Sequence, residues 1–311
     1  MSFFSIIIPL YNKENEIEKT LQSVFNQIFT DYEVIVINDG STDKSEQKVN
    51  LFSDERLRLI TTKNQGVAHA RNLGISEAKG QLIAFLDADD YWFPMHLESL
   101  YQLNQNFPEA GLLATNYQFY YSDKKRITPI FEGIPTEKWS GIVPDFFKSS
   151  MKYRLVCSST VAIKRVVFDE IGNFKNYNAG EDNEMWLRIA IHYPVAFNNQ
   201  VGVYYCMNTA NKISELDTKK KHFPPLNEFL DLEKKSTTLK KYLDLLRSEF
   251  ALKKKLSGET ELYHFYYNQL NPKNLHWKTR VLLQLPTVVL KILFYIKKTS
   301  EKFGYNVSSY H

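Results

Sequence analysis

The sequence contains few of the residues on which several protein classes depend. Two of its 311 residues are cysteines, Cys157 and Cys206, which are too few for a disulfide framework or a four-cysteine zinc site. Such low cysteine content suits a reducing compartment. Hydrophobic residues make up 43% and charged residues 24% of the chain, a balance that excludes intrinsic disorder and fibrous repeats. This length predicts one large domain or two modest ones.

The common phosphate-binding and zinc motifs are missing as well. A dinucleotide-binding fold needs G-x-G-x-x-G after its first strand and a P-loop needs G-x-x-x-x-G-K-[ST], but Gly40 is the sole glycine before Gly66. No H-E-x-x-H motif occurs, and the seven histidines form no pair with ligand spacing. The amino terminus has no basic region or small-residue cleavage site. We therefore expect no secretory signal and a cytoplasmic location.

Positive charge is concentrated towards the carboxyl end. The net charge is +4, yet residues 1–210 are acidic on balance and residues 211–311 are strongly basic. We expect a folded body over 1–210 and a basic α-helical region over 211–311 that faces an anionic surface. Within that region, 281–296 is shorter than the about 20 apolar residues of a spanning helix, and its basic flanks favour a helix lying at a membrane surface. A helical cap packed on the body is the alternative.

The first 120 residues alternate between strand-like and helix-like hydrophobic patterns. Their order predicts an α/β fold, with a mostly parallel sheet flanked by helices. A long charged helix is expected further along, over 226–256. The predicted strands are 3–9, 33–38, 57–60 and 82–86, and the predicted helices are 14–26, 66–78 and 94–106.

Polar or charged residues follow the carboxyl end of each predicted strand, where ligands of parallel sheets bind. The most acidic of these segments is Asp87-Ala88-Asp89-Asp90. Neighbouring carboxylates repel one another unless a cation or hydrogen-bond donors neutralise them. Mg²⁺ and Mn²⁺ prefer such oxygen ligands and often bridge a carboxylate to a phosphate. A metal–phosphate site and a solvated acidic turn explain this cluster equally well.

Other polar residues near the predicted strand ends each allow two interpretations. Asp39 can accept hydrogen bonds from a base or ribose, or it can cap its own turn. Arg71 can pair with a phosphate or an acid, or it can lie exposed on its helix. Tyr11 can stack on a base or pack on its loop. Glu181 and Asp182 open a predicted helix, where carboxylates are stabilised, or they supply a general base for an acceptor hydroxyl.

Four segments together resemble the family 2 glycosyltransferases, which have the GT-A fold. The segments lie in order within residues 3–205 and read FSIIIPLYNKENEIEKTLQSVFNQ, YEVIVINDGSTD, NQGVAHARNLGISEAKGQLIAFLDADD and AGEDNEMWLRIA. The resemblance implies transfer of a sugar, with inversion, from a nucleotide-diphosphate sugar, most commonly a UDP-sugar. It implies a glycan or lipid-linked acceptor in cell-envelope or capsular polysaccharide synthesis, and Mg²⁺ or Mn²⁺ as cofactor. The basic, partly apolar carboxyl-terminal segment predicts a location at the inner face of the cell membrane, where lipid-linked sugars reside.

The same resemblance implies roles for individual residues. Asp182 matches the second acid of the E-D motif, the usual catalytic base, and Glu181 would help position the acceptor. Asp87 and Asp89 match the D-x-D motif that holds the ribose and the metal-bound diphosphate, and both are therefore expected metal ligands. The expected nucleotide-binding residues are Pro9, Tyr11, Glu14, Asp39, Arg71, Asp87 and Ala88.

Two departures from the processive members of the family indicate that this chain does not build a polymer processively. The Q-x-x-R-W motif and long transmembrane helices are absent from the sequence, which favours transfer of one sugar per encounter. Trp186 lies beside the E-D motif and is expected either to pack its helix on the sheet or to stack on a sugar.

Other functions are less consistent with the motifs. A sugar nucleotidyltransferase should have a glycine-rich loop after the first strand, and a non-catalytic nucleotide-sugar-binding protein should have lost one of the motif acids. Neither holds for this sequence. Nucleic-acid binding through the basic region has no motif beyond charge, so we expect no nucleic-acid partner.

Overall fold

The computed structural model describes residues 2–136, 138–209 and 218–302. Its strands form one sheet in which strands distant in sequence are neighbours. The strands are β1 (Phe4–Leu10), β2 (Tyr32–Asp39), β3 (Leu57–Thr62), β4 (Leu82–Phe85), β5 (Tyr91–Trp92), β6 (Leu112–Ser122), β7 (Lys125–Ile127), β8 (Ser140–Ile142), β9 (Val161–Lys164) and β10 (Val195–Cys206). Their order is β3-β2-β1-β4-β9-β6-β10-β5, with β7 paired to β6 and β8 to β10.

The amino-terminal half of the sheet is parallel, as the sequence predicts. Strand β1 pairs in parallel with β2 and β4, and β2 pairs in parallel with β3. Every residue of β2 and β4 is buried, which is typical of a sheet covered on both faces. The pairs of β9 with β4 and β6 are antiparallel, whereas β6 and β10 are again parallel. The sheet as a whole is therefore mixed, and hydrophobic periodicity alone does not show where its direction changes.

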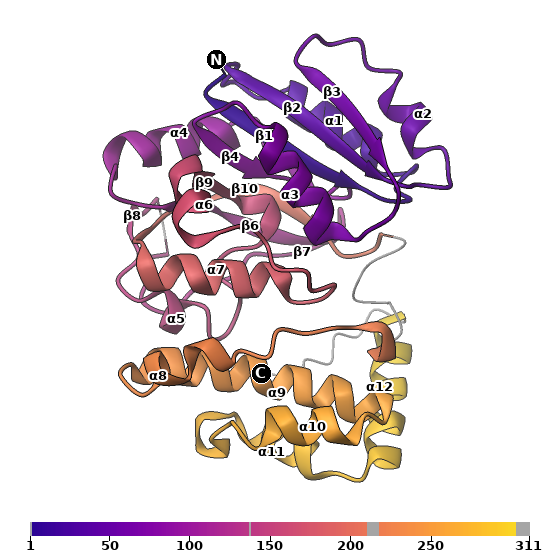
Figure 1. The fold of residues 1–311 in the computed structure, drawn as a ribbon, viewed down its shortest axis with the longest axis vertical. Helices are drawn as coiled ribbons and strands as arrows, with labels where there is room; N and C mark the ends of the chain where they lie inside the picture. The colour runs from indigo at the N-terminus through magenta and orange to yellow at the C-terminus, as the bar shows by residue number, and fades with distance from the viewer. Residues whose placement is uncertain (1, 137, 210–217, 303–311) are drawn as a thin grey trace.

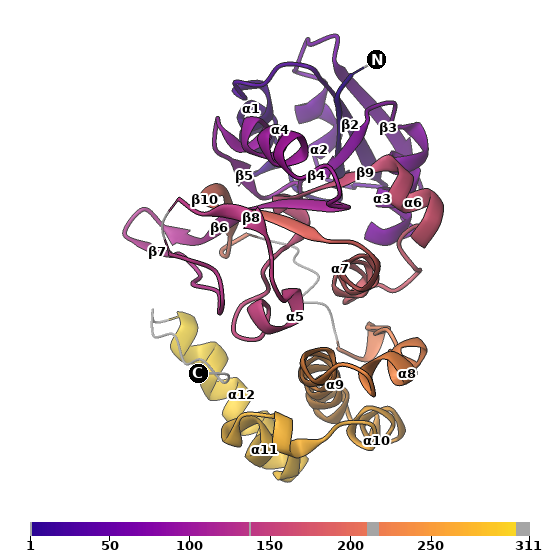
Figure 2. The same ribbon diagram turned by 90° about the vertical axis from the view of Figure 1, so that its left-hand side faces the viewer.

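Helices cover both faces of the sheet, with α1 and α4 on one side and α3 and α6 on the other (Figure 2). Helix α3 packs on β1 and β2, while α4 packs on β6 and β10. The α/β class and the flanking helices are therefore confirmed. The helices of this body are α1 (Ile17–Phe25), α2 (Ser45–Val49), α3 (Val67–Glu77), α4 (His96–Asn106), α5 (Phe146–Ser149), α6 (Arg165–Ile171) and α7 (Glu181–His192).

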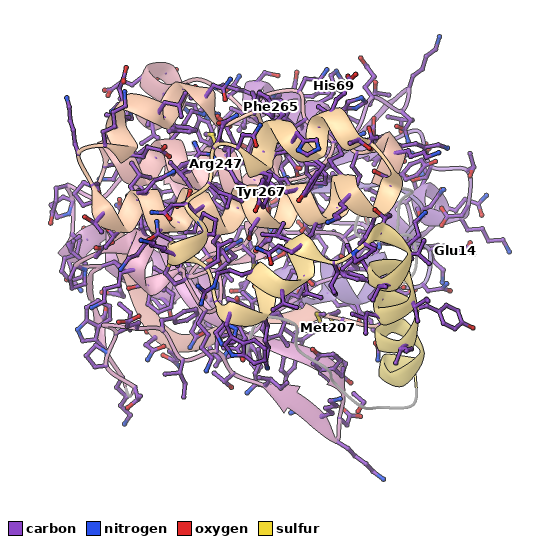
Figure 3. The ribbon with its side chains drawn as sticks, turned by 90° about the horizontal axis from the view of Figure 1, so that it is seen from below. Glu14, His69, Met207, Arg247, Phe265 and Tyr267 are labelled. Atoms are coloured by element: carbon purple, nitrogen blue, oxygen red, sulfur yellow. The ribbon has the colours of Figure 1, made fainter. Side chains whose placement is uncertain are left out.

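The carboxyl-terminal helices form a layer beneath α5 and α7 (Figure 1). Figure 3 looks onto this layer from below, with Arg247 on α9, Phe265 and Tyr267 on α10, and α12 at one edge of the layer. The predicted domain boundary at residue 210 lies outside the described residues. The helices of the layer are α8 (Leu230–Glu233), α9 (Thr237–Ser257), α10 (Thr260–Tyr267), α11 (Trp277–Gln284) and α12 (Thr287–Lys302).

The prediction of one long helix over 226–256 is wrong, because α8 and α9 are separate. Ser236 lies between them in an extended conformation, and its Oγ accepts a hydrogen bond from the backbone N–H of Leu239 at 3.3 Å. A serine in that role satisfies a backbone donor that the first turn of a helix leaves unpaired. The apolar segment that follows is divided at Pro286 into α11 and α12.

Two apolar clusters hold the layers together. The larger lies on both faces of the sheet, and the smaller lies between α7 and the carboxyl-terminal helices. In the smaller cluster, Ala179 and Leu187 from around α7 join Leu246 and Phe250 of α9. Helix α9 therefore packs directly beneath the helix that begins with Glu181 and Asp182.

Candidate active site

The loops after β1 and β2 are hydrogen-bonded to each other at the carboxyl end of the sheet. The backbone N–H of Asn12 donates to Ser41 Oγ at 3.0 Å, and Asn12 Oδ1 accepts from the N–H of Thr42 at 2.8 Å. Asn12 has a φ of +50°, a left-handed conformation that non-glycine residues seldom adopt and that often marks ligand sites. Glu14, a predicted nucleotide ligand, accepts from the N–H of Lys44 at 2.9 Å. One of its oxygens is thus engaged in joining the loops.

Three other predicted nucleotide-binding residues differ in how far their side chains are exposed to solvent. Tyr11 is 42% exposed, which leaves its ring accessible for stacking, and Pro9 is half-buried. Ala88 is buried, and its carbonyl accepts a hydrogen bond from Thr20 Oγ1 at 3.0 Å.

Asp39 lies at the end of β2 and holds the start of α3. Its Oδ1 accepts from the N–H of Gln65 at 2.9 Å, and its Oδ2 accepts from the N–H of Gly66 at 2.8 Å. Gly66 precedes α3 with a φ of +94°, which glycine adopts without steric cost. The carboxylate therefore binds the backbone of the loop that leads into α3, and no hydrogen bond to its own turn is among these contacts. Each oxygen has a second lone pair that can still accept a hydrogen bond.

Arg71 of α3 connects the two acidic motifs. Its Nη1 donates to Glu181 Oε1 at 2.8 Å and its Nη2 donates to Asp87 Oδ1 at 3.0 Å. The arginine side chain is 3% exposed and also lies over the ring of Phe174. The exposed-arginine interpretation is therefore wrong. Three segments distant in sequence, namely α3, the end of β4 and the start of α7, converge on one guanidinium.

Burial and charge shift the protonation of this group of residues. Burial, together with the neighbouring charge of Asp182, raises the pKa of Glu181 to about 7, although Arg71 opposes both effects. Burial also raises the pKa of Asp87. The pKa of Arg71 is raised despite its burial, because Asp87, Glu181 and Asp182 surround the guanidinium. Arg71 thus stays charged, whereas Glu181 titrates close to neutrality.

Asp182 is half-buried and begins the same helix as Glu181. Its Oδ1 accepts hydrogen bonds from the backbone N–H and the side-chain amide of Asn183, at 2.7 and 2.9 Å. Gly180, which precedes α7, has a φ of +79° and is packed against Phe250 of α9. The helix start is therefore fixed from below, while the Asp182 carboxylate remains partly accessible to solvent.

The acids of the D-x-D-D segment occupy different environments. Asp90 is buried, with Oδ2 accepting from Ser159 Oγ at 2.5 Å and Oδ1 accepting from the N–H of Cys206 at 2.9 Å. Burial, together with the nearby Asp89 and Asp87, raises the pKa of Asp90 well above its ordinary value. Asp90 thus ties the end of β4 to β10, which leaves Asp87 and Asp89 as the acids that can face a ligand.

Asp89 is bound to a lysine that the sequence analysis did not single out. Lys13 Nζ lies 2.7 Å from Asp89 Oδ2, and Thr209 Oγ1 donates to the same oxygen at 2.6 Å. Both members of the ion pair are largely buried. Lys13 follows Asn12 in the loop after β1, so it brings a positive charge to the end of β4.

A divalent cation fits this site only with the help of a bound ligand. Within the described residues, no three His, Cys, Asp or Glu side chains are placed to hold a metal ion together. Asp89 offers one carboxylate, and Mg²⁺ characteristically binds one or two carboxylates and completes its shell with substrate phosphates and waters. Asp87 offers a second carboxylate, of which one oxygen is engaged by Arg71. The carboxylates of Asp87 and Asp89 therefore suit a divalent cation that binds together with a diphosphate.

An open cavity of about 470 Å³ lies beside Asp89. Its wall includes Glu16 and Lys19 from the start of α1, and Tyr91 and Tyr120 from the sheet. Its volume is within the range of small-molecule sites. Trp186, by contrast, is 2% exposed and packs against Phe85 and Phe174, so it packs its helix and does not stack on a sugar.

Comparison with known proteins agrees with this geometry. The model of Glycosyl transferase family 2 matches residues 5–172. A UDP-Glc:alpha-D-GlcNAc-diphosphoundecaprenol beta-1,3-glucosyltransferase of Escherichia coli, WfaP, is 34% identical over 226 residues, which cover 70% of this chain and 83% of WfaP. An uncharacterized glycosyltransferase of Rickettsia bellii is 35% identical over 190 residues, or 60% of this chain, which spans about a quarter (26%) of that longer protein.

A solved structure shares the fold along almost the whole chain. The structure of S. aureus TarS residues 1–349, in complex with UDP-GlcNAc, covers 98% of this chain and 92% of its own with a TM-score of 0.64 and 17% identity. The likeness therefore extends over the carboxyl-terminal helices as well as the sheet, and it establishes the GT-A arrangement. The family match over more than half of the residues and this likeness in fold agree with each other. The chain belongs to glycosyl transferase family 2 and is a glycosyltransferase of the GT-A fold.

Proposed function

We propose that this enzyme transfers one sugar, with inversion, from a UDP-sugar to a hydroxyl of a glycan or lipid-linked acceptor. The observation that carries the proposal is the position of Arg71, which brings Asp87 of the D-x-D motif and Glu181 of the E-D motif into one site. Two relatives support the choice of donor. The name of the E. coli protein specifies a UDP-Glc donor and a diphosphoundecaprenol acceptor, and TarS was solved with UDP-GlcNAc.

We propose that residues 1–210 are the catalytic domain and that residues 211–311 are a separate helical region. In the catalytic domain, the nucleotide lies over the carboxyl ends of β1, β2 and β4. Tyr11 stacks on the base, because its ring is exposed at that edge. The other proposed nucleotide-binding residues are Pro9, Glu14, Asp39, Arg71, Asp87 and Ala88.

Asp182 is proposed as the general base. As the acceptor oxygen attacks the anomeric carbon, the bond from that carbon to the diphosphate breaks and Asp182 accepts the hydroxyl proton. A displacement of this kind needs no protein nucleophile, and one carboxylate on the face opposite the leaving group is sufficient. Its half-buried position at the start of α7 lets Asp182 reach an acceptor while Asn183 fixes its orientation.

Glu181 is proposed to act as a positioning residue rather than to touch the acceptor. Its side chain is 5% exposed and bonded to Arg71, so its carboxylate faces the protein interior. By holding the guanidinium, Glu181 fixes Asp87 on one side and the start of α7 on the other.

Asp89, with Asp87, is proposed to hold Mg²⁺ or Mn²⁺ together with the donor diphosphate. When bound, the cation stabilises the negative charge that develops on the departing diphosphate. Arg71 and Lys13 are the protein's own positive charges beside these two acids. They offset the repulsion that the carboxylates would otherwise exert on a phosphate.

We propose that the enzyme acts in cell-envelope or capsular polysaccharide synthesis, at the inner face of the cell membrane. The proposal as a whole is tested by UDP release. The wild-type chain, Asp182→Asn and Asp169→Asn are incubated with a panel of UDP-sugars and lipid-linked oligosaccharide acceptors. Acceptor-dependent release by the wild type and by the exposed-carboxylate control Asp169→Asn, but not by Asp182→Asn, is the expected result. Equal release by Asp182→Asn would contradict the assigned base.

A further inference from the structure

Helix α12 presents apolar side chains to solvent along residues 288–296. It packs on the carboxyl-terminal layer through the buried Leu290 and the half-buried Phe294, which lie one turn apart. The remaining apolar residues point elsewhere, and we call these six side chains the α12 face. They are Val288, Val289, Ile292, Leu293, Tyr295 and Ile296, with exposed fractions between 40% and 74%.

The spacing shows that the α12 face is continuous. Val288, Ile292 and Tyr295 follow one another at helical intervals of four and three, and Val289, Leu293 and Ile296 form the adjacent row. On α11, Trp277 and Val281 are also exposed and lie one turn apart. A helix that is apolar on nearly all sides is normally buried, and a soluble surface seldom carries so extended an apolar patch.

Charge shows what kind of surface would cover the α12 face. Residues 262–300 contain no Asp or Glu, but they contain six Lys or Arg residues. Among them, Lys278 and Arg280 lie on α11 and the exposed Lys291 lies within α12. Apart from Glu301 near its end, α12 thus carries only basic charges, and apolar side chains flanked by basic ones are typical of helices that lie in the plane of a bilayer containing anionic lipids.

We infer that α11 and α12 bind the surface of an anionic lipid bilayer, with the α12 face inserted among the lipid headgroups and acyl chains. Within the described residues, no helix is long and apolar enough to cross a membrane. Surface binding is therefore the mode that matches these helices. A second copy of the chain fits less well, because two such faces would bring like charges together.

This inference deepens the proposed function, since it names the surface that brings the enzyme to a lipid-linked acceptor. The helical layer that carries the α12 face also packs beneath α7. Phe250 of α9 lies where a side chain at Gly180, the residue before the E-D pair, would point, and Leu290 of α12 belongs to the same apolar cluster as Phe250. A bilayer on the α12 face would therefore stand at a fixed position relative to the catalytic helix.

Vesicle co-sedimentation of the full chain tests the inference without any nucleotide. The vesicles contain either phosphatidylcholine alone or phosphatidylcholine with phosphatidylglycerol. We compare the wild type with Ile292→Glu and Lys291→Glu, and with Leu51→Glu as a matched control. Leu51 is 72% exposed in the body, far from the α12 face in sequence, so its substitution controls for an added surface charge. Unchanged melting temperatures verify that each variant is folded.

The wild type and Leu51→Glu are expected to bind the anionic vesicles at least about tenfold more tightly than Ile292→Glu and Lys291→Glu do. Binding to phosphatidylcholine alone should be weaker, and salt should lower the affinity for anionic vesicles. Equal binding by all four proteins, or no binding by the wild type, would overturn the inference. A wild-type dimer that Ile292→Glu converts to a monomer, without vesicle binding, would instead identify a second copy as the occupant. Because these outcomes do not involve UDP, failure here leaves the proposed reaction untouched.

Discussion

The guanidinium of Arg71 donates a hydrogen bond to the carboxylate of Glu181 at 2.8 Å, across 110 positions of sequence and beneath the protein surface. The same guanidinium holds Asp87, so one buried cation links α3, the end of β4 and the start of α7. Two motifs that lie far apart in the chain thereby become one site. The Arg71–Glu181 pair thus joins the two motifs in the folded protein.

Replacement of Arg71 by methionine is expected to lower the free energy of unfolding by about 3–5 kcal/mol, because two carboxylates lose a buried partner. Urea unfolding at neutral pH measures the change. Lys234→Met is the control, since Lys234 forms an exposed ion pair with Asp231 and its loss should leave the stability unchanged. Equal stability of Arg71→Met and the wild type would show that Arg71 does not hold the site together.

The stability of the wild type is expected to fall as pH rises from about 4.5 to about 7. The pKa of Glu181 is raised from 4.5 to about 7 in the folded protein, so the folded state binds the proton more tightly than the unfolded state does. The stabilisation is complete below the unfolded pKa and is lost as pH passes through the folded pKa. At 1.36 kcal/mol per pKa unit, it amounts to about 3 kcal/mol at most.

Glu181→Gln isolates this contribution, because a glutamine does not titrate. Urea unfolding of both proteins at several pH values between 4.5 and 8 measures the difference in slope. The wild-type curve should descend more steeply than that of Glu181→Gln across this interval. Parallel curves would mean that Glu181 is ionised in the folded protein throughout.

Asp182→Asn is expected to lower sugar transfer by about 10²–10⁴-fold, the usual contribution of a general base. Its affinity for UDP should stay near the wild-type value, since the proposed role of Asp182 is to take the acceptor proton. Isothermal titration with UDP and a UDP-release assay measure the two quantities. Loss of UDP binding, or transfer at the wild-type rate, would refute the assignment.

Asp89 and Asp90 are neighbours whose substitutions are expected to differ in their effect on UDP binding. Asp90→Ala should lower the free energy of unfolding by about 1–3 kcal/mol, because Ser159 and the N–H of Cys206 lose their buried acceptor. The folded fraction should still bind UDP. Asp89→Asn should also lower the stability, because the largely buried Lys13 loses its charged partner, but it should in addition weaken the binding of UDP with Mn²⁺ by about tenfold or more.

Unfolding curves and UDP titrations of these two variants, made side by side, separate structural from ligand-binding acids. If Asp90→Ala lost UDP affinity while Asp89→Asn kept it, the roles given to the two residues would be reversed. Equal effects of both substitutions would favour the solvated acidic turn over a metal–phosphate site.

Much of the fold could be predicted because its signals are local. The apolar run of β2 and the polar residues after it are adjacent in sequence, so the strand and the exposed end of the sheet both follow from the pattern. The break within the predicted helix over 226–256 was also recoverable, because Ser236 is a typical residue to precede a helix. The antiparallel pairing of β9 was not, since strand direction depends on contacts between distant segments.

In the site, too, residues within local sequence motifs could be predicted, whereas residues brought near by folding could not. The motif acids and Arg71 stand in segments that the sequence marks, but their partners do not. Lys13 is 76 positions from Asp89, and Thr209 is 120 positions from it. A lysine between two predicted nucleotide-loop residues offered a weak signal for Lys13, whereas nothing in the sequence distinguishes Thr209 from other threonines. Side chains that join a site from distant positions in the sequence can be identified only in the folded structure.

Thermal unfolding with a panel of nucleoside diphosphates is the most direct test of the central claim, that this glycosyltransferase binds a UDP-sugar at Asp87 and Asp89. At about 100 times its dissociation constant, a ligand adds about 2.7 kcal/mol to the stability of the folded protein. We expect UDP with Mn²⁺ to raise the melting temperature of the wild type, and a chelator or Asp89→Asn to remove most of the shift. A folded protein whose melting temperature no nucleoside diphosphate changes, with or without Mn²⁺, would contradict the claim.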